Sequence, residues 1–444
     1  MAHYIGTVLK KLTLGALGVM AATLLFLAIF PVRGTRDAEP PRVLSAARGD
    51  GPLTAGAGAV ALAAPPGTPI GGYPRLRFAS QGVRDEPMAR AIVLSEPGLS
   101  VAIASVDILL VPAALQAKVE ARLADLKLDA LLVGATHTHA GPGGFWKDAL
   151  GERFGTGPHD PAWEEALAGR IADAVRAAAS ARAPSRLSVA RVRLPGLVVN
   201  RDGGETNGRL LALRVEHTDG ELVGQVVVFP SHATVHGSRN RLLSGDWPGA
   251  LARDLPGVTV FLQGAEGDQT WRRPVERPGA RPDDAAENYA RLLADEVRRL
   301  PFPPGDGAPA LAAASAEVTL PAPSFGAAPP FLDRLLSNLL WNWLPARTRV
   351  VALQTGPAVL LVVPAEPGEA VGRGWRDAAG PGAEVVSLVG DYVGYVETPE
   401  GVRARTGEAR RTYLGPELAK ALGDGLAAAR GALPPLPPAP PANR

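Results

Sequence analysis

The sequence predicts an α/β or α+β fold, with one large domain whose buried mixed β-sheet is flanked by helices. Short apolar runs of strand length alternate with longer amphipathic segments, which is the pattern of a sheet covered by helices. The composition, 46% hydrophobic and 20% charged over 444 residues, is that of a packed globular protein. The sequence contains no internal repeat, so we expect a single compact body.

The N-terminal element is predicted to be a membrane-spanning helix. The stretch Leu12–Val32 has no charged residue and is about twenty residues long, which is enough to cross a bilayer. Lys10 and Lys11 precede it and favour a body on the extracytoplasmic side. The alternative is that residues 1–33 form a cleaved signal peptide, in which case the body is secreted.

Two further segments are predicted to lie outside the folded domain. Residues 34–65 are rich in Gly, Ala, Pro and Arg without periodicity, which predicts a flexible linker. Residues 431–444 are rich in proline and predict an extended tail. The folded domain is therefore predicted to span residues 66–430.

Within this domain, strands are predicted at short apolar runs and helices at amphipathic stretches. The strands are expected at 102–110, 130–135, 224–229, 258–262 and 359–363, and the helices at 113–126, 161–183 and 283–300. The segment Pro330–Pro345 is apolar and aromatic but too short to span a membrane. It is expected either to lie on lipid or guide an apolar substrate, or to pack as a helix against the body.

Composition also narrows the class of protein. The formal net charge is only +2 and forms no basic stripe, so nucleic acid is not expected as a partner. The chain has no cysteine, which excludes disulfides, a thiolate nucleophile and thiolate metal ligands. Any metal must therefore be held by histidine, carboxylate or phenolate groups.

Four of the seven histidines fall in two clusters directly after predicted strands. His137 and His139 form the first cluster, and His232 and His236 form the second. If the extended conformation continues past the first strand, His137 and His139 project to the same side. Two imidazoles on one face can hold a metal ion, although the pattern His-Thr-His is a weak motif by itself.

The carboxylate that commonly completes a zinc site is not fixed by spacing. Zinc sites with an open position combine histidine with a carboxylate. Five candidates follow apolar runs: Glu266, Asp268, Glu366, Glu369 and Asp391. Spacing does not choose among them.

Several separated blocks resemble a known family over about residues 66–420. They are Ala135–Gly144, Asn200-Arg201, Phe229–Thr234, Ser244–Asp246, Gly264–Thr270, Pro364–Glu366, Gly390–Thr398 and Leu414–Pro416. In this order they are similar to blocks of the neutral/alkaline non-lysosomal ceramidases, zinc enzymes that hydrolyse the amide of N-acylsphingosine. The most specific block is Ala-Thr-His-Thr-His-Ala-Gly-Pro-Gly-Gly.

The resemblance implies which residues act. It implies that zinc is held by His137, His232, Glu366 and Tyr395. Such a ligand set leaves a position for a water molecule, which attacks the amide carbonyl.

Three more residues are implied to act beside the metal. A protonated His139 stabilises the developing oxyanion, and Arg201 binds or polarises the substrate. Thr270, which replaces a serine of the family, is expected to support the substrate and not to act as a nucleophile. One departure is the second tyrosine of the family, whose place falls on Gly407. Another is that the chain leaves no room for a C-terminal immunoglobulin-like domain.

The resulting prediction is a zinc-dependent amidohydrolase that cleaves an N-acyl amide, ceramide or a related amphiphilic N-acyl lipid, outside the cytoplasmic membrane. One alternative is an envelope zinc hydrolase with a non-ceramide amide or ester substrate. Another is a membrane-tethered binding protein with a degenerate site. The oligomeric state and the acyl chain are not predicted.

Overall fold

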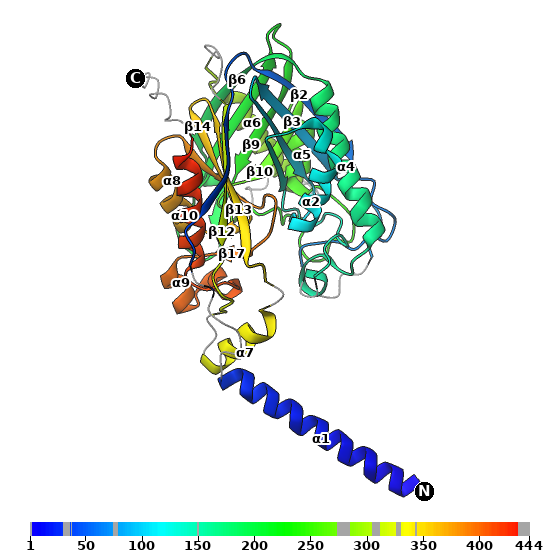
Figure 1. The fold of residues 1–444 in the computed structure, drawn as a ribbon. Coiled ribbons are helices and arrows are strands. Elements are labelled where there is room, and N and C mark those ends of the chain that lie inside the picture. The colour runs from blue at the N-terminus through cyan, green and yellow to red at the C-terminus, as the bar shows by residue number, and fades with distance from the viewer. Residues whose placement is uncertain are drawn as a thin grey trace.

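The computed structural model describes residues 2–29, 36, 38–73, 79–148, 151–272, 285–303, 311–325, 330–341 and 344–433. Its body has four layers, in which two mixed sheets face each other and helices cover both outer faces (Figure 1). Successive side chains of a strand point to opposite faces of the sheet, so they pack in different hydrophobic cores. On β3 (Met88–Glu96), Ala91 and Val93 face the helices, whereas Ile92 and Leu94 face the other sheet.

The larger sheet has eight strands among the described residues, in the order β10-β9-β8-β6-β2-β3-β4-β5. The β10/β9 and β4/β5 pairs are parallel and the other pairs are antiparallel. Besides β3, its strands are β10 (Val258–Gln263), β9 (Leu222–Phe229), β8 (Arg209–His217), β6 (Ala183–Arg193), β2 (Thr54–Ala61), β4 (Leu99–Val106) and β5 (Ala130–Ala135). The helices on its outer face are α2 (Ala113–Arg122), α4 (Pro161–Ser180), α5 (Asp246–Asp254) and α6 (Ala285–Arg299).

The smaller sheet has the order β1-β12-β13-β14-β16, with only the β14/β16 pair parallel. Its strands are β1 (Arg42–Arg48), β12 (Leu311–Thr319), β13 (Arg347–Thr355), β14 (Ala358–Val362) and β16 (Ala383–Val386). Helices α8 (Glu369–Ala379) and α10 (Leu418–Gly431) pack on its outer face.

Shorter elements connect the two sheets. Two strand pairs are β7 (Val198–Asn200) with β11 (Gln269–Trp271) and β15 (Glu366–Pro367) with β17 (Tyr395–Val396). The remaining helices are α1 (Ala2–Ile29), α7 (Pro330–Leu340) and α9 (Pro399–Ala404). Single helical turns lie at Ala124–Leu126, Glu152–Thr156, Pro195–Leu197 and Gly407–Arg411.

The predicted fold class is confirmed, because a large mixed sheet is flanked by helices. The predicted helices correspond to α2, α4 and α6, and the predicted strands to β4, β5, β9, β10 and β14. The prediction of one sheet is incomplete. The strands divide between two sheets, and their shared core consists of side chains from both.

The prediction of a flexible linker at residues 34–65 is wrong, because this segment contains β1 and β2, which pair with other strands of the two sheets. The small residues of β2 have little strand propensity, so the sequence did not predict this strand. They are required by packing against α4. A Cβ on Gly56 would lie 2.3 Å from the carbonyl oxygen of Ala178, and one on Gly58 would lie 2.5 Å from that of Ala174.

The N-terminal stretch forms helix α1, which projects away from the body, with α7 at its base (Figure 1). Asn338 of α7 donates a hydrogen bond to the carbonyl oxygen of Leu27 at 2.8 Å. Over the described parts of the chain, no helix is long and apolar enough to cross a bilayer, so the structure does not support the predicted membrane-spanning helix. Of the predicted tail at 431–444, residues 434–444 lie outside the described residues.

Candidate metal centre

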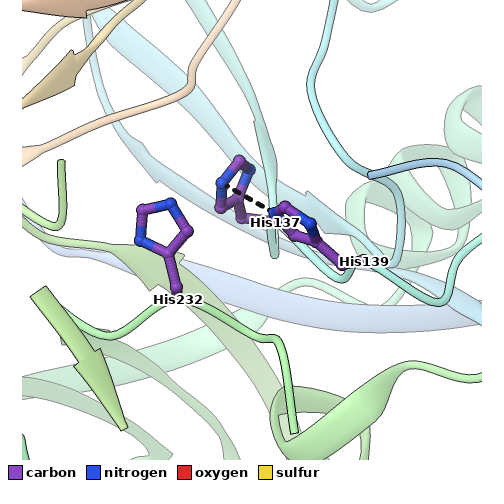
Figure 2. A group of neighbouring side chains, drawn as sticks. All are labelled: His137, His139 and His232. Atoms are coloured by element: carbon purple, nitrogen blue, oxygen red, sulfur yellow. Dashed lines mark hydrogen bonds between the residues drawn. The ribbon is translucent and has the colours of Figure 1, made fainter. Parts of the chain in front are cut away.

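His137 and His139 lie on the turn that follows β5. The condition that the extended conformation continues past this strand is not met, because β5 ends at Ala135 and His137 has a left-handed φ of 63°. A non-glycine residue held there costs roughly 1–3 kcal/mol, and such strain gathers at functional sites. The turn still brings the two rings together, with 3.3 Å between their Nε2 atoms (Figure 2).

Backbone carbonyls fix the orientation of two buried rings. His137 Nδ1 lies 2.7 Å from the carbonyl oxygen of Leu109, and His232 Nδ1 lies 3.0 Å from those of Glu266 and Gln269. Because a carbonyl oxygen only accepts hydrogen bonds, both Nδ1 atoms carry the hydrogen and both Nε2 atoms keep a lone pair. Metal-binding histidines are oriented in this way.

Glu366 and Tyr395 reach the same point from paired strands β15 and β17, in which they are opposite each other. Glu366 Oε2 lies 3.3 Å from His137 Nε2 and 3.2 Å from His232 Nε2. The Tyr395 hydroxyl lies 3.3 Å from His232 Nε2. Glu366 is 2% exposed, and its Oε2 accepts no hydrogen bond from the described residues. A buried carboxylate oxygen therefore faces two ring nitrogens that carry lone pairs.

A metal cation resolves this arrangement better than protonation of the rings. Burial, followed by the charge of Arg201, lowers the pKa of His232 to about 3. Burial, followed by the charges of His137 and His232, holds the pKa of His139 well below its usual range. The three rings place their nitrogens within 4.8 Å of one another, so they can hold one metal ion. His139 is therefore neutral, unlike the protonated form that the resemblance implied.

Two groups lie near Glu366: Tyr392, which received no role from the sequence, and Glu266, which was one of the five candidate carboxylates. The Tyr392 hydroxyl donates a hydrogen bond to Glu366 Oε1 at 2.7 Å. Glu266 is fully buried and accepts a hydrogen bond from Ser387. Burial, followed by the charge of Glu366, raises the pKa of Glu266 well above its usual value. These shifts favour the neutral form of Glu266 and place the negative charge of the centre on Glu366.

Arg201 also lies at the centre, whereas Thr270 reaches it through the backbone. Arg201 Nη2 donates to His232 Nε2 at 3.4 Å and pairs with Glu408 Oε1 at 3.3 Å. Thr270 lies on β11, where its backbone forms a bridge with His232. The structure thus brings the side chains of all four proposed ligands together with His139 and Arg201. The catalytic roles of His139, Arg201 and Thr270 stay predictions.

The other candidates from the sequence lie elsewhere. His236 Nε2 is 3.1 Å from Ser244 Oγ, which donates to Asp85 at 2.5 Å. The Ser244 carbonyl oxygen accepts from Thr138 Oγ1 at 3.0 Å, so this cluster holds the turn that carries His137. The remaining carboxylates have other partners: Asp268 with Asn200, Glu369 with Arg376 and Asp391 with Thr348.

Gly407, at the place of the second family tyrosine, does not admit a side chain in this backbone. Its φ is 50°, and a Cβ there would lie 1.8 Å from Asp202 Oδ2. Tyr413 instead approaches the centre from the same segment, because a Cβ on Gly394 would lie 2.7 Å from the Tyr413 ring. Burial, followed by the charge of Glu366, raises the pKa of Tyr413.

The fold and this centre together define an α/β protein in which buried imidazole, carboxylate and phenol groups converge at a site that could hold a metal ion. Residues 56–255 match the sequence model of the family described as neutral/alkaline non-lysosomal ceramidase, N-terminal. This match over residues 56–255 confirms the resemblance to the neutral/alkaline ceramidases seen in the sequence.

Comparisons with individual proteins agree. The neutral ceramidase of Pseudomonas aeruginosa is 26% identical over 243 residues, which is 48% of this chain and 36% of the relative. The neutral ceramidase of Mycobacterium tuberculosis is 34% identical over 150 residues, which is 30% of this chain and 23% of that protein. The aligned segments thus span about a third of these relatives or less.

Solved structures share the fold. The crystal structure of neutral ceramidase from Pseudomonas aeruginosa has a TM-score of 0.74 at 21% identity, covering 88% of this chain and 77% of that one. A structure described as ceramidase complexed with C2 has a TM-score of 0.73 at 20% identity, with the same coverage.

Proposed function

We propose that the chain is a zinc-dependent amidohydrolase that cleaves an N-acyl amide, with ceramide or a related N-acyl lipid as its substrate. The observation that carries this proposal is the convergence of Glu366 Oε2 on the Nε2 atoms of His137 and His232. Both named relatives are neutral ceramidases, which supports the choice of an amide in a lipid.

Zinc suits the donor set. Imidazole, carboxylate and phenol oxygens without a thiolate are compatible with a site that keeps one position open. The phenol form of Tyr395 also needs a cation to ionise, because burial and then the charge of Glu366 raise the pKa of Tyr395 well above its usual value. A bound cation offsets both causes.

The chemistry then divides among the side chains. Bound zinc supplies Lewis-acid chemistry, in that it lowers the pKa of water and polarises a carbonyl. Arg201, whose guanidinium lies beside His232, orients the carbonyl oxygen of the substrate. His139 lies beside the proposed ligand His137, so its ring is placed to carry a proton from the attacking water to the leaving amine nitrogen.

We further propose that the substrate reaches the site from a lipid surface outside the cytoplasm, with the chain anchored there or secreted. Helix α7 exposes Phe331 and Leu339 beside α1, and exposed apolar side chains of this kind suit an amphiphilic substrate.

The test is to measure bound metal and fatty-acid release by mass spectrometry, using ceramide and a panel of other N-acyl amides. We expect about one zinc per chain and release from at least one N-acyl lipid, both lost in His137→Ala. The matched control is His217→Gln, because His217 lies at the opposite end of the β8/β9 pair from the centre and contacts Ser185. Less than about half a zinc after loading would contradict the metal, and zinc without amide cleavage would contradict the substrate.

A further inference from the structure

A second cavity lies between the two sheets, away from the metal centre. It has a volume of about 350 Å³ and lies between a face of the smaller sheet, at β12 and β13, and the edge strand β5 with helix α2. Pockets that hold small ligands begin at about 300 Å³. Its lining is mixed, and the apolar part includes Leu131, Leu132, Val351, Val362 and Val389.

The buried polar group of this cavity is a hydrogen-bond acceptor without a donor. Gln116 is 8% exposed and lines the cavity. Its Nε2 donates to Glu120 Oε1 at 2.9 Å and to the carbonyl oxygen of Leu131 at 3.0 Å, which fixes the orientation of the amide. Gln116 Oε1 therefore points the other way, and no described residue donates to it. A buried acceptor left in this state favours a ligand that donates.

Asp391 adds a negative charge to the wall of the cavity. Its carboxylate accepts hydrogen bonds from Thr348 Oγ1 at 2.8 Å and from the Tyr392 amide at 2.7 Å. No Arg or Lys among the described residues pairs with it. Asp391 and Gln116 border the same space, because Gly390, its neighbour in the chain, has an ideal Cβ position 3.9 Å from Gln116 Oε1.

The balance of charge around the cavity is negative. Its lining includes four carboxylates and two guanidiniums: Glu120, Asp129, Glu317 and Asp391 against Arg347 and Arg349. Both arginines lie at the rim, with side chains 52% and 58% exposed, and each already pairs with one of these glutamates. Asp391 also accepts a hydrogen bond from the backbone amide of Ala113, but no Arg or Lys among the described residues pairs with it, so the cavity favours a cation over an anion.

We propose that this cavity binds a small primary alkylammonium ion. The ammonium group donates hydrogen bonds to Gln116 Oε1 and the Asp391 carboxylate, and the short alkyl chain lies against the apolar walls. One residue of the cavity lining, Asp391, is adjacent in sequence to Tyr392 at the metal centre. Asp391 accepts from the amide of Tyr392, whose hydroxyl donates to Glu366.

The test is calorimetric titration of the full chain with hexylammonium, and with hexanoate and hexanol as probes of matched length. We expect one hexylammonium per chain and binding of hexanoate weaker by about tenfold or more. Asp391→Asn and Gln116→Met should each weaken hexylammonium by about tenfold. Asn keeps an acceptor for the Tyr392 amide, so this variant is expected to fold. The control Asp377→Asn changes an exposed carboxylate on α8 and should leave binding unchanged.

An amine can also bind a metal, so the titration is repeated on His137→Ala. Hexylammonium binding that persists there assigns the site to the cavity whether or not the proposed amidase function holds. Three results would overturn the proposal: no binding of hexylammonium, equal binding of hexanoate, or unchanged affinity in both cavity variants. Loss of binding in His137→Ala alone would move the ligand to the metal centre and also overturn it.

Discussion

The two halves of the metal centre are built differently. On the histidine half, His137 and His232 follow strands of the larger sheet, and their Nδ1 atoms are held by backbone carbonyls. On the acidic half, Glu366 and Tyr395 lie on two-residue strands, and Glu366 is oriented by the side chain of Tyr392. The histidine half therefore depends on the main chain, whereas the acidic half depends on individual side chains and is sensitive to single substitutions.

The same division separates what comparison and structure each contribute. The family match ends at residue 255, so it includes both histidines but neither Glu366 nor Tyr395. The acidic half is joined to the histidine half by distances of 3.2–3.3 Å in the structure. Substitutions on the two halves therefore test whether they form one centre.

The largest expected effect is that of Glu366→Gln, which removes the negative charge and keeps the shape. We expect metal affinity to fall by more than the roughly 10- to 100-fold that changes outside the ligands cost. Amide cleavage should fall with it by about 10³-fold or more. Metal content and cleavage rate are measured on the same preparation. Full metal content with normal cleavage would remove Glu366 from the centre.

His139→Gln should have the next largest effect and distinguishes two roles for this ring. If His139 acts beside the metal, kcat falls by about 10²–10³-fold while the zinc content is unchanged. Its Nε2 lies 3.3 Å from that of His137, so a ligand role is also geometrically open. Loss of zinc in this variant would make His139 a ligand and count against its assignment as the proton carrier.

Tyr392→Phe sharpens the contrast between the halves. It removes the hydrogen bond to Glu366 Oε1 and should lower metal affinity by roughly 10- to 100-fold. The carbonyl oxygens that hold His137 and His232 belong to the backbone, so no equivalent side-chain substitution exists on that half. The control is Tyr289→Phe, whose hydroxyl bonds to Leu197 and Ser231. Equal metal affinity in both variants would contradict the orienting role of Tyr392.

The fold was predictable where strands are strongly apolar. The runs that became β5, β9, β10 and β14 are apolar enough to be recognised. The strand β2 was not, since its alanines and glycines are dictated by the approach of α4 and carry no strand signal. The second sheet was missed because assigning strands to sheets depends on long-range pairing, such as that of β1 with β12.

The sequence predicted which residues gather at the site, but it did not predict the protonation states of their side chains. Position in the blocks indicated His137, His232, Glu366 and Tyr395, and the structure brings these side chains together. The left-handed φ of His137 and the neutral state of His139 were not foreseen, because both depend on tertiary burial. Tyr392 lies within the block Gly390–Thr398, but its hydrogen bond to Glu366 depends on tertiary packing and was not predicted.

The smallest expected effect on metal binding is that of Glu266→Gln, although Glu266 and Glu366 are both buried glutamates. Glu266 is already protonated, so its neutral amide isostere should change metal affinity by less than about tenfold.

The same substitution tests the protonation through stability. The folded pKa of Glu266 is raised above 4.5, so the unfolded state loses its proton first as pH rises. This carboxyl therefore makes the metal-free wild-type chain less stable between about pH 4.5 and neutral pH, and Glu266→Gln removes that loss. Urea unfolding across this range, with a chelator present, measures the difference. A variant that is less stable than wild type at neutral pH would show that Glu266 is ionised. The negative charge assigned to Glu366 alone would then have to be shared by both glutamates.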